Sequence, residues 1–392
     1  MERGHDIVLF GATGYTGALT AEYLATSAPR GLRWALAGRD RDRLEAVRAE
    51  LAEIDPDRPV PELLLADAED PGSLRALAAS ARVVVTTVGP YGPYGEPLVA
   101  ACAAEGTDYV DLCGEPAFVD LVYARHHATA VRTGARLVHA CGFDSVPHDL
   151  GVLFTVEQLP EGVPLSVEGF VRARGGVSGG TLRSAVGAFA DTSGMRRAAR
   201  ERRLVEPPLR GRRVRVDHRV RPRTRLARGW AVPLPTLDPR VVVRSAAALE
   251  RYGPDFSYGH YAAFRRLGGA LGAVGGAAGV VAAAQVPALR SRLRNLVPAG
   301  AGPTEEQLAN GWFTVHFTGA GGGRRVHTLV SGGEPGYGAT SGMLAESALC
   351  LWEDDLPPTS GQVTTAVAMG DALIRRLPRA GVDFEVLRAV RD

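Results

Sequence analysis

Lysine is absent from this 392-residue sequence, so all 45 of its basic residues are arginine. A guanidinium group stays protonated and cannot act as an amine nucleophile, which excludes a mechanism that proceeds through a Schiff base. A catalytic Tyr-x-x-x-Lys pair of the short-chain dehydrogenase type is excluded for the same reason. The formal net charge is only +2, so the total charge favours no particular class of partner.

Cysteine is scarce, and its four copies form no C-x-x-C pair: they are Cys102, Cys113, Cys141 and Cys350. Isolated cysteines are typical of free thiols in a reducing compartment and argue against a disulfide framework or a zinc site. No secretory signal precedes the first apolar run, because Asp6 directly adjoins it. We therefore expect a cytoplasmic protein with no bound metal.

Strand-like and helix-like patterns alternate through the first 150 residues. Strands are predicted at 7–10, 32–37, 62–66, 83–88, 109–112 and 136–140. Helices are predicted between them, among others at 41–51, 71–79, 96–105 and 116–133. This alternation predicts an α/β fold with a Rossmann-like, doubly wound parallel sheet, whose ligand binds beyond the carboxyl ends of the strands.

The first predicted strand runs into the sequence GATGYTG, which precedes a segment of helical pattern. Its glycines, Gly11, Gly14 and Gly17, follow G-x-x-G-x-x-G spacing rather than G-x-G-x-x-G. Glycines in such a turn let the chain reverse, let N–H groups approach a pyrophosphate and let the helix pack closely on the strand. We expect this loop, including Thr13 and Tyr15, to bind dinucleotide phosphates at the helix N-terminus. A purely structural turn is the alternative.

A basic side chain follows the second predicted strand, about twenty residues past the glycines, where NAD usually meets an acid and the 2′-phosphate of NADP meets arginine. Arg39 holds this place and Arg43 follows one helical turn later, while Asp40 is explained as the N-cap of the next helix. The sequence therefore favours NADPH over NADH. Asp67, at the end of the third strand, is either a contact for the adenine edge or an ordinary loop acid.

Two loops at strand ends carry the candidate catalytic groups. The fourth strand ends in two Gly-Pro-Tyr repeats, which would hold Tyr91 and Tyr94 beside a nicotinamide. A phenol there can act as an acid or an oxyanion donor, and aromatic packing over the cofactor ribose is the alternative. The sixth strand leads into Asp144, Ser145 and His148. We expect either a proton-donating His148 or helix capping by one of the other two.

Patterns typical of β-strands continue beyond residue 150, at 166–175, 212–220, 311–321 and 324–332. They predict a second, mixed or antiparallel α+β domain that binds substrate. We place the NADP-binding Rossmann domain at 1–150 and the substrate or lid domain at 151–337. Helical patterns at 338–352 and 363–377 end the chain, and residues 338–392 are expected to pack back on the first domain.

Two segments of unusual composition stand outside this scheme. Residues 196–228 hold fourteen arginines and three acids, which predicts either a docking surface for an acidic carrier protein or coenzyme A phosphates, or a solvated loop and hairpin. Nucleic acid is not expected, because no aromatic residues are interleaved with the arginines. Residues 267–289 carry no charge and are flanked by Arg265, Arg266 and Arg290. We expect a surface helix or lid over an apolar substrate, with peripheral membrane contact, rather than a membrane span.

Four stretches, GATGYTG, AGRDRDRL, TTVGPYGPYGEPLVAACAAEGTDYVDLCGE and GFDSVPHDLG, resemble the saccharopine dehydrogenase-like oxidoreductases. Within that group the chain looks like the trans-acting enoyl reductase family, and the likeness resumes at EPGYGATSGMLAESALCL and AMGDALIRRL. One departure is the pair Thr364-Thr365, where the family tends to have Thr-Pro. The pair keeps an N-cap candidate but loses a rigid helix start.

The resemblance implies an NADPH-binding Rossmann domain and a second, mixed-sheet domain. It also implies reduction of a double bond in a polyketide-derived chain that a partner synthase presents. Carried over by position, the three glycines and Arg39 become cofactor contacts. The loop formed by Thr87, Gly89 and Tyr91 then lies along the cofactor phosphates and ribose.

These observations favour an NADPH-dependent reductase of the activated C=C bond in an acyl-thioester, polyketide-type or other apolar substrate. Tyr94 would donate to the carbonyl oxygen or protonate the α-carbon, with His148 as the second candidate. Two alternatives stay open: reduction of an imine or ketone in a biosynthetic pathway, and a non-catalytic NADP-binding protein on lipid surfaces. A polyketide synthase or carrier protein is the expected macromolecular partner.

Overall fold

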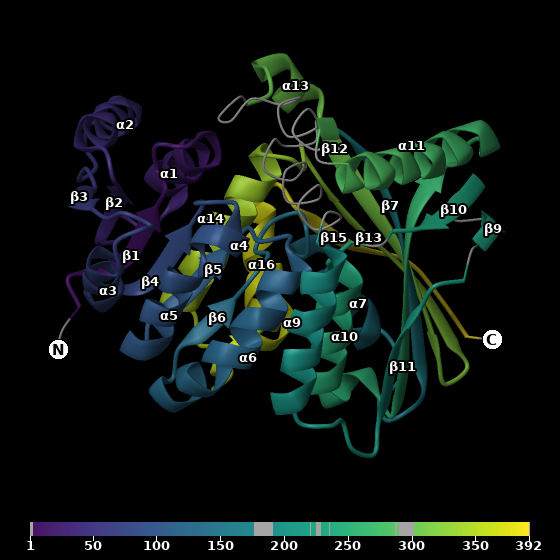
Figure 1. Cartoon of the computed structure of the whole chain (residues 1–392). Helices are drawn as coiled ribbons and strands as arrows, with labels where there is room; N and C mark the ends of the chain where they lie inside the picture. The colour runs from purple at the N-terminus through teal and green to yellow at the C-terminus, as the bar shows by residue number, and fades with distance from the viewer. Residues whose placement is uncertain are drawn as a thin grey trace.

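A computed structural model describes residues 3–175, 191–219, 221–224, 229–234, 236–286, 288–289 and 302–391 of the chain. Two sheets lie on either side of a central group of helices (Figure 1). The strands of the first sheet are β1 (His5–Phe10), β2 (Trp34–Gly38), β3 (Glu62–Leu65), β4 (Ala81–Thr86), β5 (Asp108–Asp111), β6 (Arg136–Val138) and β14 (Gly361–Val363). They are all parallel, in the order β14-β6-β5-β4-β1-β2-β3. The part β3-β2-β1-β4-β5-β6 is the Rossmann order, which confirms the predicted fold class.

The central strands β1, β2 and β4 are buried on both faces of this sheet, which explains why they are largely apolar. Along β1, Ile7 and Leu9 enter one core, and Val8 and Phe10 enter the other. The first core is covered by α1 (Tyr15–Ser27), α2 (Arg41–Ile54) and α14 (Gly338–Glu353). The second is covered by α3 (Pro71–Ser80), α5 (Glu96–Glu105) and α6 (Pro116–Thr133). These last three have proline in the first turn, where its missing N–H costs nothing, and they confirm the predicted helices.

The second sheet is mixed. Its strands among the described residues are β7 (Leu165–Arg174), β8 (Arg213–Asp217), β9 (Arg221–Thr224), β10 (Gly229–Pro233), β11 (Asp255–Phe264), β12 (Trp312–Gly321), β13 (Arg324–Gly332) and β15 (Asp383–Arg391). They run in the order β15-β13-β12-β7-β11-β10-β9, with β8 also paired to β11. The pairs β7–β11 and β8–β11 are parallel and the others antiparallel. The strand patterns predicted in this half correspond to β7, β8, β12 and β13.

The end of the chain differs from the prediction of one helix at 363–377. Gly370 adopts a φ of +46°, which favours glycine and separates α15 (Thr365–Ala368) from α16 (Gly370–Arg376). The final residues form β15, which pairs antiparallel with the edge of β13. Thr364 caps α15, since its Oγ1 accepts a hydrogen bond from Val367 N at 3.3 Å. The predicted N-cap at this position is therefore confirmed.

Helices α7 (Val146–Glu157) and α10 (Asp238–Ala248) lie between the two sheets (Figure 1). Helix α7 packs on β12, β13 and α10, and α10 packs on β8 and β11. Gly151 allows this approach, because a Cβ there would lie 2.4 Å from the ring of Phe317. Asp149 accepts hydrogen bonds from Thr365 Oγ1 and Ala366 N, both at 2.8 Å. Helix α7, which follows β6 in the chain, therefore lies between the two sheets with the residues of its first turn.

Candidate functional site

The glycine loop crosses the carboxyl end of β1, and its three glycines serve different purposes. Gly11 has a φ of +94°, and a Cβ there would lie 2.8 Å from side-chain atoms of Thr87 and Val88. A Cβ on Gly17 would lie 2.1 Å from the carbonyl oxygen of Gly11. Gly14 is exposed and begins α1, which no described side chain caps. The N-terminus of α1 thus has no capping side chain among the described residues, which suits binding of a phosphate there.

Thr13 and Tyr15 of this loop contact other elements. The carbonyl oxygen of Thr13 accepts a hydrogen bond from Arg43 Nη2 at 3.4 Å. Tyr15 donates to the carbonyl oxygen of Pro303 at 3.3 Å, and its ring packs edge-on against Tyr337 with centroids 4.9 Å apart. The segment that precedes α13 (Glu305–Asn310) thus lies against the glycine loop. Because the Tyr15 hydroxyl is engaged there, a cofactor would meet the backbone or ring of this residue.

Two arginines lie beside the same loop. Arg39 is exposed at the end of β2, and Arg43 reaches the loop from α2. The Asp40 carboxylate is engaged at the start of α2, where its Oδ1 accepts a hydrogen bond from Arg43 N at 3.1 Å and caps the helix. The N-cap interpretation of Asp40 is therefore confirmed, and the two guanidinium groups fit a 2′-phosphate. Asp67 closes a local turn by accepting from Glu69 N at 3.0 Å, so its adenine contact stays a prediction.

We expect Arg39→Ala to raise the KM for NADPH by about 10- to 150-fold, because a hydrogen bond to a charged group contributes about 1.5–3 kcal/mol. The KM for NADH should change little, since that cofactor has no 2′-phosphate. Steady-state kinetics with both cofactors measures the difference. Arg41→Ala, which removes a neighbouring exposed arginine, is the matched control. Equal losses with NADPH and NADH would contradict the role given to Arg39.

Tyr91 holds the loops after β4 and β5 together. Its buried hydroxyl donates to the carbonyl oxygen of Thr86 at 3.3 Å and accepts from Leu112 N at 3.1 Å. The carboxylate of Glu115 accepts from Tyr91 N and Gly92 N, both at 3.0 Å. Burial raises the pKa of Tyr91 well above its usual value, so this phenol stays protonated. The hydroxyl and the backbone N–H of Tyr91 are thus both engaged within the protein, and its cofactor contact stays a prediction.

The other predicted residues of this loop are more accessible. Thr87 Oγ1 donates to the carbonyl oxygen of Gly11 at 3.1 Å, which ties the loop to the glycine loop. Gly89 is exposed, and Tyr94, the last residue of α4 (Tyr91–Tyr94), exposes 40% of its surface. Of the two tyrosines, Tyr94 is therefore the one whose hydroxyl a ligand can reach.

Asp144 lies in the loop between β6 and α7, close to the loop after β5. A Cβ on Gly114 would lie 3.0 Å from Asp144 Oδ2. Burial raises the pKa of Asp144 to about 6. Ser145 Oγ donates to the carbonyl oxygen of Asp144 at 2.6 Å, and neither side chain caps α7. The expected helix capping by Asp144 or Ser145 is therefore wrong, and the Asp144 carboxyl is left at the carboxyl edge of the sheet.

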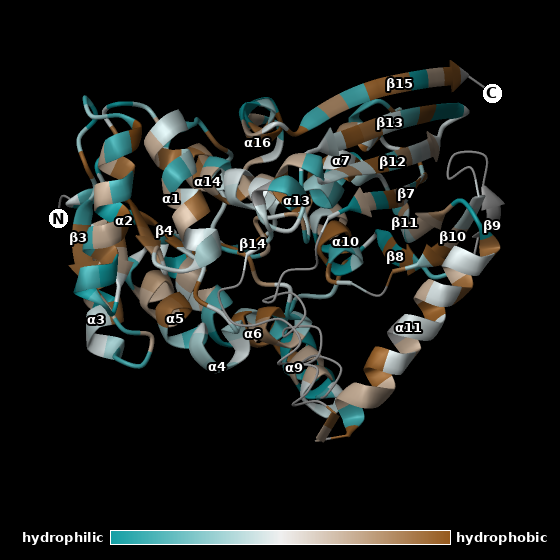
Figure 2. Ribbon diagram, turned by 90° about the horizontal axis from the view of Figure 1, so that it is seen from above, coloured by the Kyte–Doolittle hydropathy of each residue, from teal (hydrophilic) through white to brown (hydrophobic). Residues whose placement is uncertain are grey.

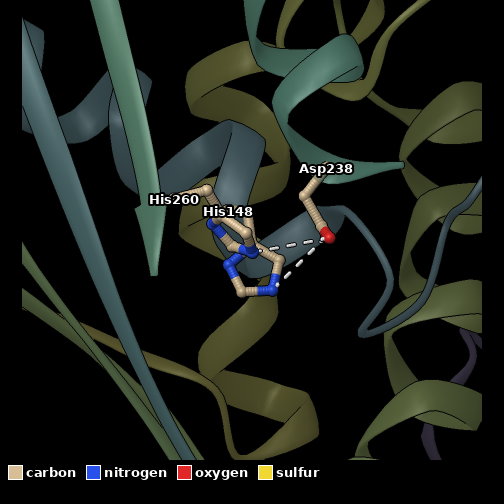
Figure 3. A group of neighbouring side chains, drawn as sticks. All are labelled: His148, Asp238 and His260. Carbon is tan, nitrogen blue, oxygen red and sulfur yellow. Dashed lines mark ion pairs between the residues drawn. The ribbon is translucent and has the colours of Figure 1, made fainter. Parts of the chain in front are cut away.

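His148, in the first turn of α7, meets two residues that sequence reasoning missed (Figure 3). Its Nε2 lies 3.5 Å from Asp238 Oδ1, and His260 Nε2 lies 3.6 Å from Asp238 Oδ2. Asp238 begins α10 and His260 lies on β11, where its Nδ1 is 2.9 Å from Tyr258 Oη. The three side chains of this His148–Asp238–His260 cluster are only 2–5% exposed.

Burial sets the charge state of the cluster. It lowers the pKa of His148 well below its usual value, lowers that of His260 to about 3, and raises that of Asp238 well above its usual range. Both imidazoles are then neutral near pH 7, and burial favours the protonated form of the Asp238 carboxyl. His148 Nδ1 is buried and has no hydrogen-bond partner among the described residues. The cluster thus places the Asp238 carboxyl beside Nε2 of His148 and leaves Nδ1 of the same ring without a partner among the described residues.

The same residues are donors that Zn²⁺ accepts, and their three ligand atoms lie within 4.8 Å of one another. A metal-bound imidazole almost always donates its second N–H to a carboxylate, a carbonyl or water. His260 has Tyr258 as such a neighbour, whereas His148 Nδ1 has none in the described part of the chain. The donor set fits a metal only in part. The absence of a metal stays a prediction, which metal analysis of the purified protein tests.

Comparisons with known proteins agree with this geometry. The saccharopine dehydrogenase NADP binding domain family matches residues 7–138. A Mycobacterium tuberculosis protein named as a trans-acting enoyl reductase is 41% identical over 98% of this chain and 98% of its own length. The trans-acting enoyl reductase of Mycobacterium leprae is 38% identical over 97% of both chains. The solved apo saccharopine dehydrogenase (L-Glu forming) of Saccharomyces cerevisiae covers 98% of this chain and 100% of its own, with a TM-score of 0.56 and 13% identity, which is a likeness in fold.

Proposed function

The chain belongs to the trans-acting enoyl reductase family, and on that premise we propose that it reduces the activated C=C bond of an acyl thioester. It is an NADP-dependent oxidoreductase, and NADPH is its cofactor. Reduction of a C=C bond requires a hydride for one carbon and a proton for the other. The observation that carries the proposal is the His148–Asp238–His260 cluster, a buried carboxyl beside two imidazoles that lies between the Rossmann sheet and the second sheet.

The glycine loop, Arg39 and Arg43 would hold the phosphates of NADPH, which when bound supplies the hydride for the β-carbon of the substrate. Negative charge then develops on the thioester carbonyl oxygen, and a fixed hydrogen-bond donor lowers the barrier most at that place. Tyr94 is the proposed donor to this oxygen. His148 donates a proton from Nδ1 to the α-carbon, and its Nε2 takes up the proton that Asp238 holds. Solvent then reprotonates Asp238, which restores the starting protonation state of the cluster.

The surroundings of His148 suit an acyl chain. Phe143 is half-buried, and its ring lies edge-on to His148 with centroids 5.4 Å apart. The ring of Phe313 lies 4.9 Å from that of Phe143. Since His148 itself is 2% exposed, the substrate would reach it past the half-buried ring of Phe143. These aromatic neighbours of His148 favour a hydrocarbon chain over a small polar substrate.

The test is oxidation of NADPH in the presence of an enoyl-CoA thioester, with a cofactor that carries deuterium at the transferred position. We expect a saturated product with deuterium at the β-carbon. Deuterium on a carbinol or amine carbon, formed from ketone or imine substrates alone, would favour the alternative reductase activities. No oxidation with any thioester, ketone or imine would overturn the proposal in favour of a non-catalytic NADP-binding protein.

A cavity of about 400 Å³ between α9 (Thr192–Val205) and α10 supports a phosphate-bearing thioester substrate. Five of its lining residues lie on one face of α9, and the sixth is Arg240 of α10, two residues from Asp238: Thr192, Met195, Arg196, Ala199, Arg203 and Arg240. Among the described residues, three arginines and no acid line this cavity. We assign it to the phosphate of a pantetheine arm, carried by coenzyme A or a carrier protein.

Not every arginine of this region is available to a ligand. Arg202, on the same helix α9, is buried over the ring of Tyr123, at 4.0 Å from its centroid, and it donates to Glu206 Oε2 at 2.8 Å. It also lies 3.5 Å from the buried carboxylate of Asp120. The predicted solvated loop is therefore wrong for residues 196–205, which belong to a helix that one of its arginines fixes to α6. The exposed Arg196 and Arg203 remain for a partner.

We expect the double variant Arg196→Ala/Arg203→Ala to raise the KM for an enoyl-CoA by at least tenfold. Each lost charge-assisted hydrogen bond to phosphate weakens binding by about 1.5–3 kcal/mol. The KM for the matching pantetheine thioester, which has no phosphate, should stay the same. Arg197→Ala, which removes an exposed arginine on another face of α9 outside the cavity lining, is the control. An equal rise for both thioesters would remove the phosphate from the explanation.

The charge of Asp144 predicts the direction in which the pH profile of kcat moves when this residue is replaced. Above pH 6 its carboxyl is ionised, and its negative charge adds to burial in raising the pKa of Asp238. In Asp144→Asn that charge is absent, so Asp238 loses its proton at lower pH. The alkaline limb of the kcat profile should move down by about 0.5–1 pH unit. Rates below pH 6 should match the wild type, because Asp144 is neutral there. An unmoved or raised alkaline limb would contradict the coupling.

A further inference from the structure

Helix α11 (Leu267–Gln285) is apolar along its length and yet exposed. Its apolar 18-residue stretch has a mean hydropathy of 1.7, and 12% of that stretch is buried. It packs at its base on β10 and β11 and then extends beyond the second sheet (Figure 2). Leu267, Leu271 and Val274 expose 45%, 63% and 48% of their surfaces. Their i, i+4, i+7 spacing puts them in one stripe on the same helix face.

The charge around α11 has one sign only. Residues 256–304 contain no aspartate or glutamate, and their charged side chains are Arg265, Arg266, Arg290, Arg292 and Arg294. Arg265 and Arg266 are exposed and directly precede the helix. The base of the helix also adjoins β10, which pairs with the arginine-containing strand β9. An apolar stripe with arginines at its amino-terminal end complements a surface that is apolar inside and anionic outside.

We propose that α11 binds the surface of an anionic phospholipid membrane, with its Leu267–Leu271–Val274 stripe among the acyl chains and Arg265 and Arg266 at lipid phosphates. The helix would lie along the interface rather than cross it. Strand β11 before it and β12 after it belong to the same sheet, and a single crossing would separate them. Its glycine- and alanine-rich composition also gives a weaker driving force for spanning than leucine would.

Flotation of the full chain with vesicles tests this surface. The wild type should float with phosphatidylglycerol–phosphatidylcholine vesicles, and less at high salt, because charge attraction is screened. Leu271→Asp/Val274→Asp should weaken binding at least tenfold. Leu204→Asp on α9, where the side chain is 80% exposed, is the matched control and should bind as the wild type does. Arg265→Gln/Arg266→Gln should lose about fivefold per arginine on anionic vesicles.

Wild-type protein that fails to float with anionic vesicles would overturn the proposal, and so would undiminished binding of Leu271→Asp/Val274→Asp. Sedimentation velocity of the same variants tests the second possibility, that α11 forms a contact between two copies of this chain. A dimer that these substitutions convert to monomer, without vesicle binding, would assign α11 to a second copy of this chain. NADPH binding by each variant shows that the fold is intact, and it should be unchanged because α11 lies outside the proposed catalytic groups.

Discussion

Tyr94→Phe is expected to lower kcat for an enoyl thioester by about 10²–10³-fold, because one hydrogen-bond donor to the developing oxyanion is lost. The phenol suits this role by its position. It ends α4, whose first two N–H groups are fixed by the carboxylate of Glu115, and it keeps 40% of its surface exposed at the strand ends. The KM for NADPH should change little, since the ring remains and the phosphates bind elsewhere. Steady-state NADPH oxidation measures both constants.

Tyr252→Phe is the control for this substitution. The Tyr252 hydroxyl is buried without a hydrogen-bond partner in the described part of the chain, so its removal should leave kcat unchanged. A wild-type kcat in Tyr94→Phe would remove Tyr94 from the mechanism. A raised KM for NADPH at unchanged kcat would instead assign the phenol to packing over the cofactor ribose.

The Rossmann half could be predicted from the sequence because its signals are local. Strands buried on both faces read as apolar runs, and the six predicted ones end within two residues of β1 to β6. The glycine loop could be recognised because glycine is required at its positions. At Gly11 and Gly17 neighbouring atoms leave no space for a Cβ, and Gly14 leaves the N-terminus of α1 without a capping side chain. Asp40 could be assigned as an N-cap since the carboxylate accepts from a residue three positions on.

The His148–Asp238–His260 cluster could be predicted only in part. His148 stands out at the end of β6, but Asp238 and His260 lie about a hundred residues further along the chain, with no spacing that links them to it. They meet because α10 packs on α7 and β11 pairs in parallel with β7, which are long-range contacts. The one local signal was a histidine inside the aromatic run FSYGHY, which fits a buried strand equally well.

The last strand shows a different limit. Residues 383–391 follow a helical region and have no strict alternation, and they become β15 because β13 offers an unpaired edge. An edge of this kind is a property of the assembled sheet, and no window of the sequence contains it. The same holds for β14, three residues long, which extends the parallel sheet beside β6.

His148→Asn is expected to lower kcat by about 10²–10⁴-fold, the usual contribution of a positioned general acid. Asparagine keeps polar atoms in the buried site but cannot pass a proton from Asp238 to the substrate. Binding of NADPH should stay at the wild-type level, because the residues proposed to hold the cofactor are not those proposed to transfer the proton. Fluorescence titration with NADPH and single-turnover oxidation with an enoyl-CoA separate the two steps.

Two further variants are compared with His148→Asn: His260→Asn tests a positioning role, and His327→Asn is the control. His260 contacts the same carboxylate but its Nδ1 already pairs with Tyr258, so we propose that it positions Asp238 and expect a smaller loss of kcat. It should also shift the alkaline limb of the pH profile, which a purely structural residue would leave in place. His327 on β13 is outside the cluster and should have no effect. If His148→Asn kept its full single-turnover rate, the proton would have to come from another group, and Asp144 at the same strand edge would be the next residue to replace.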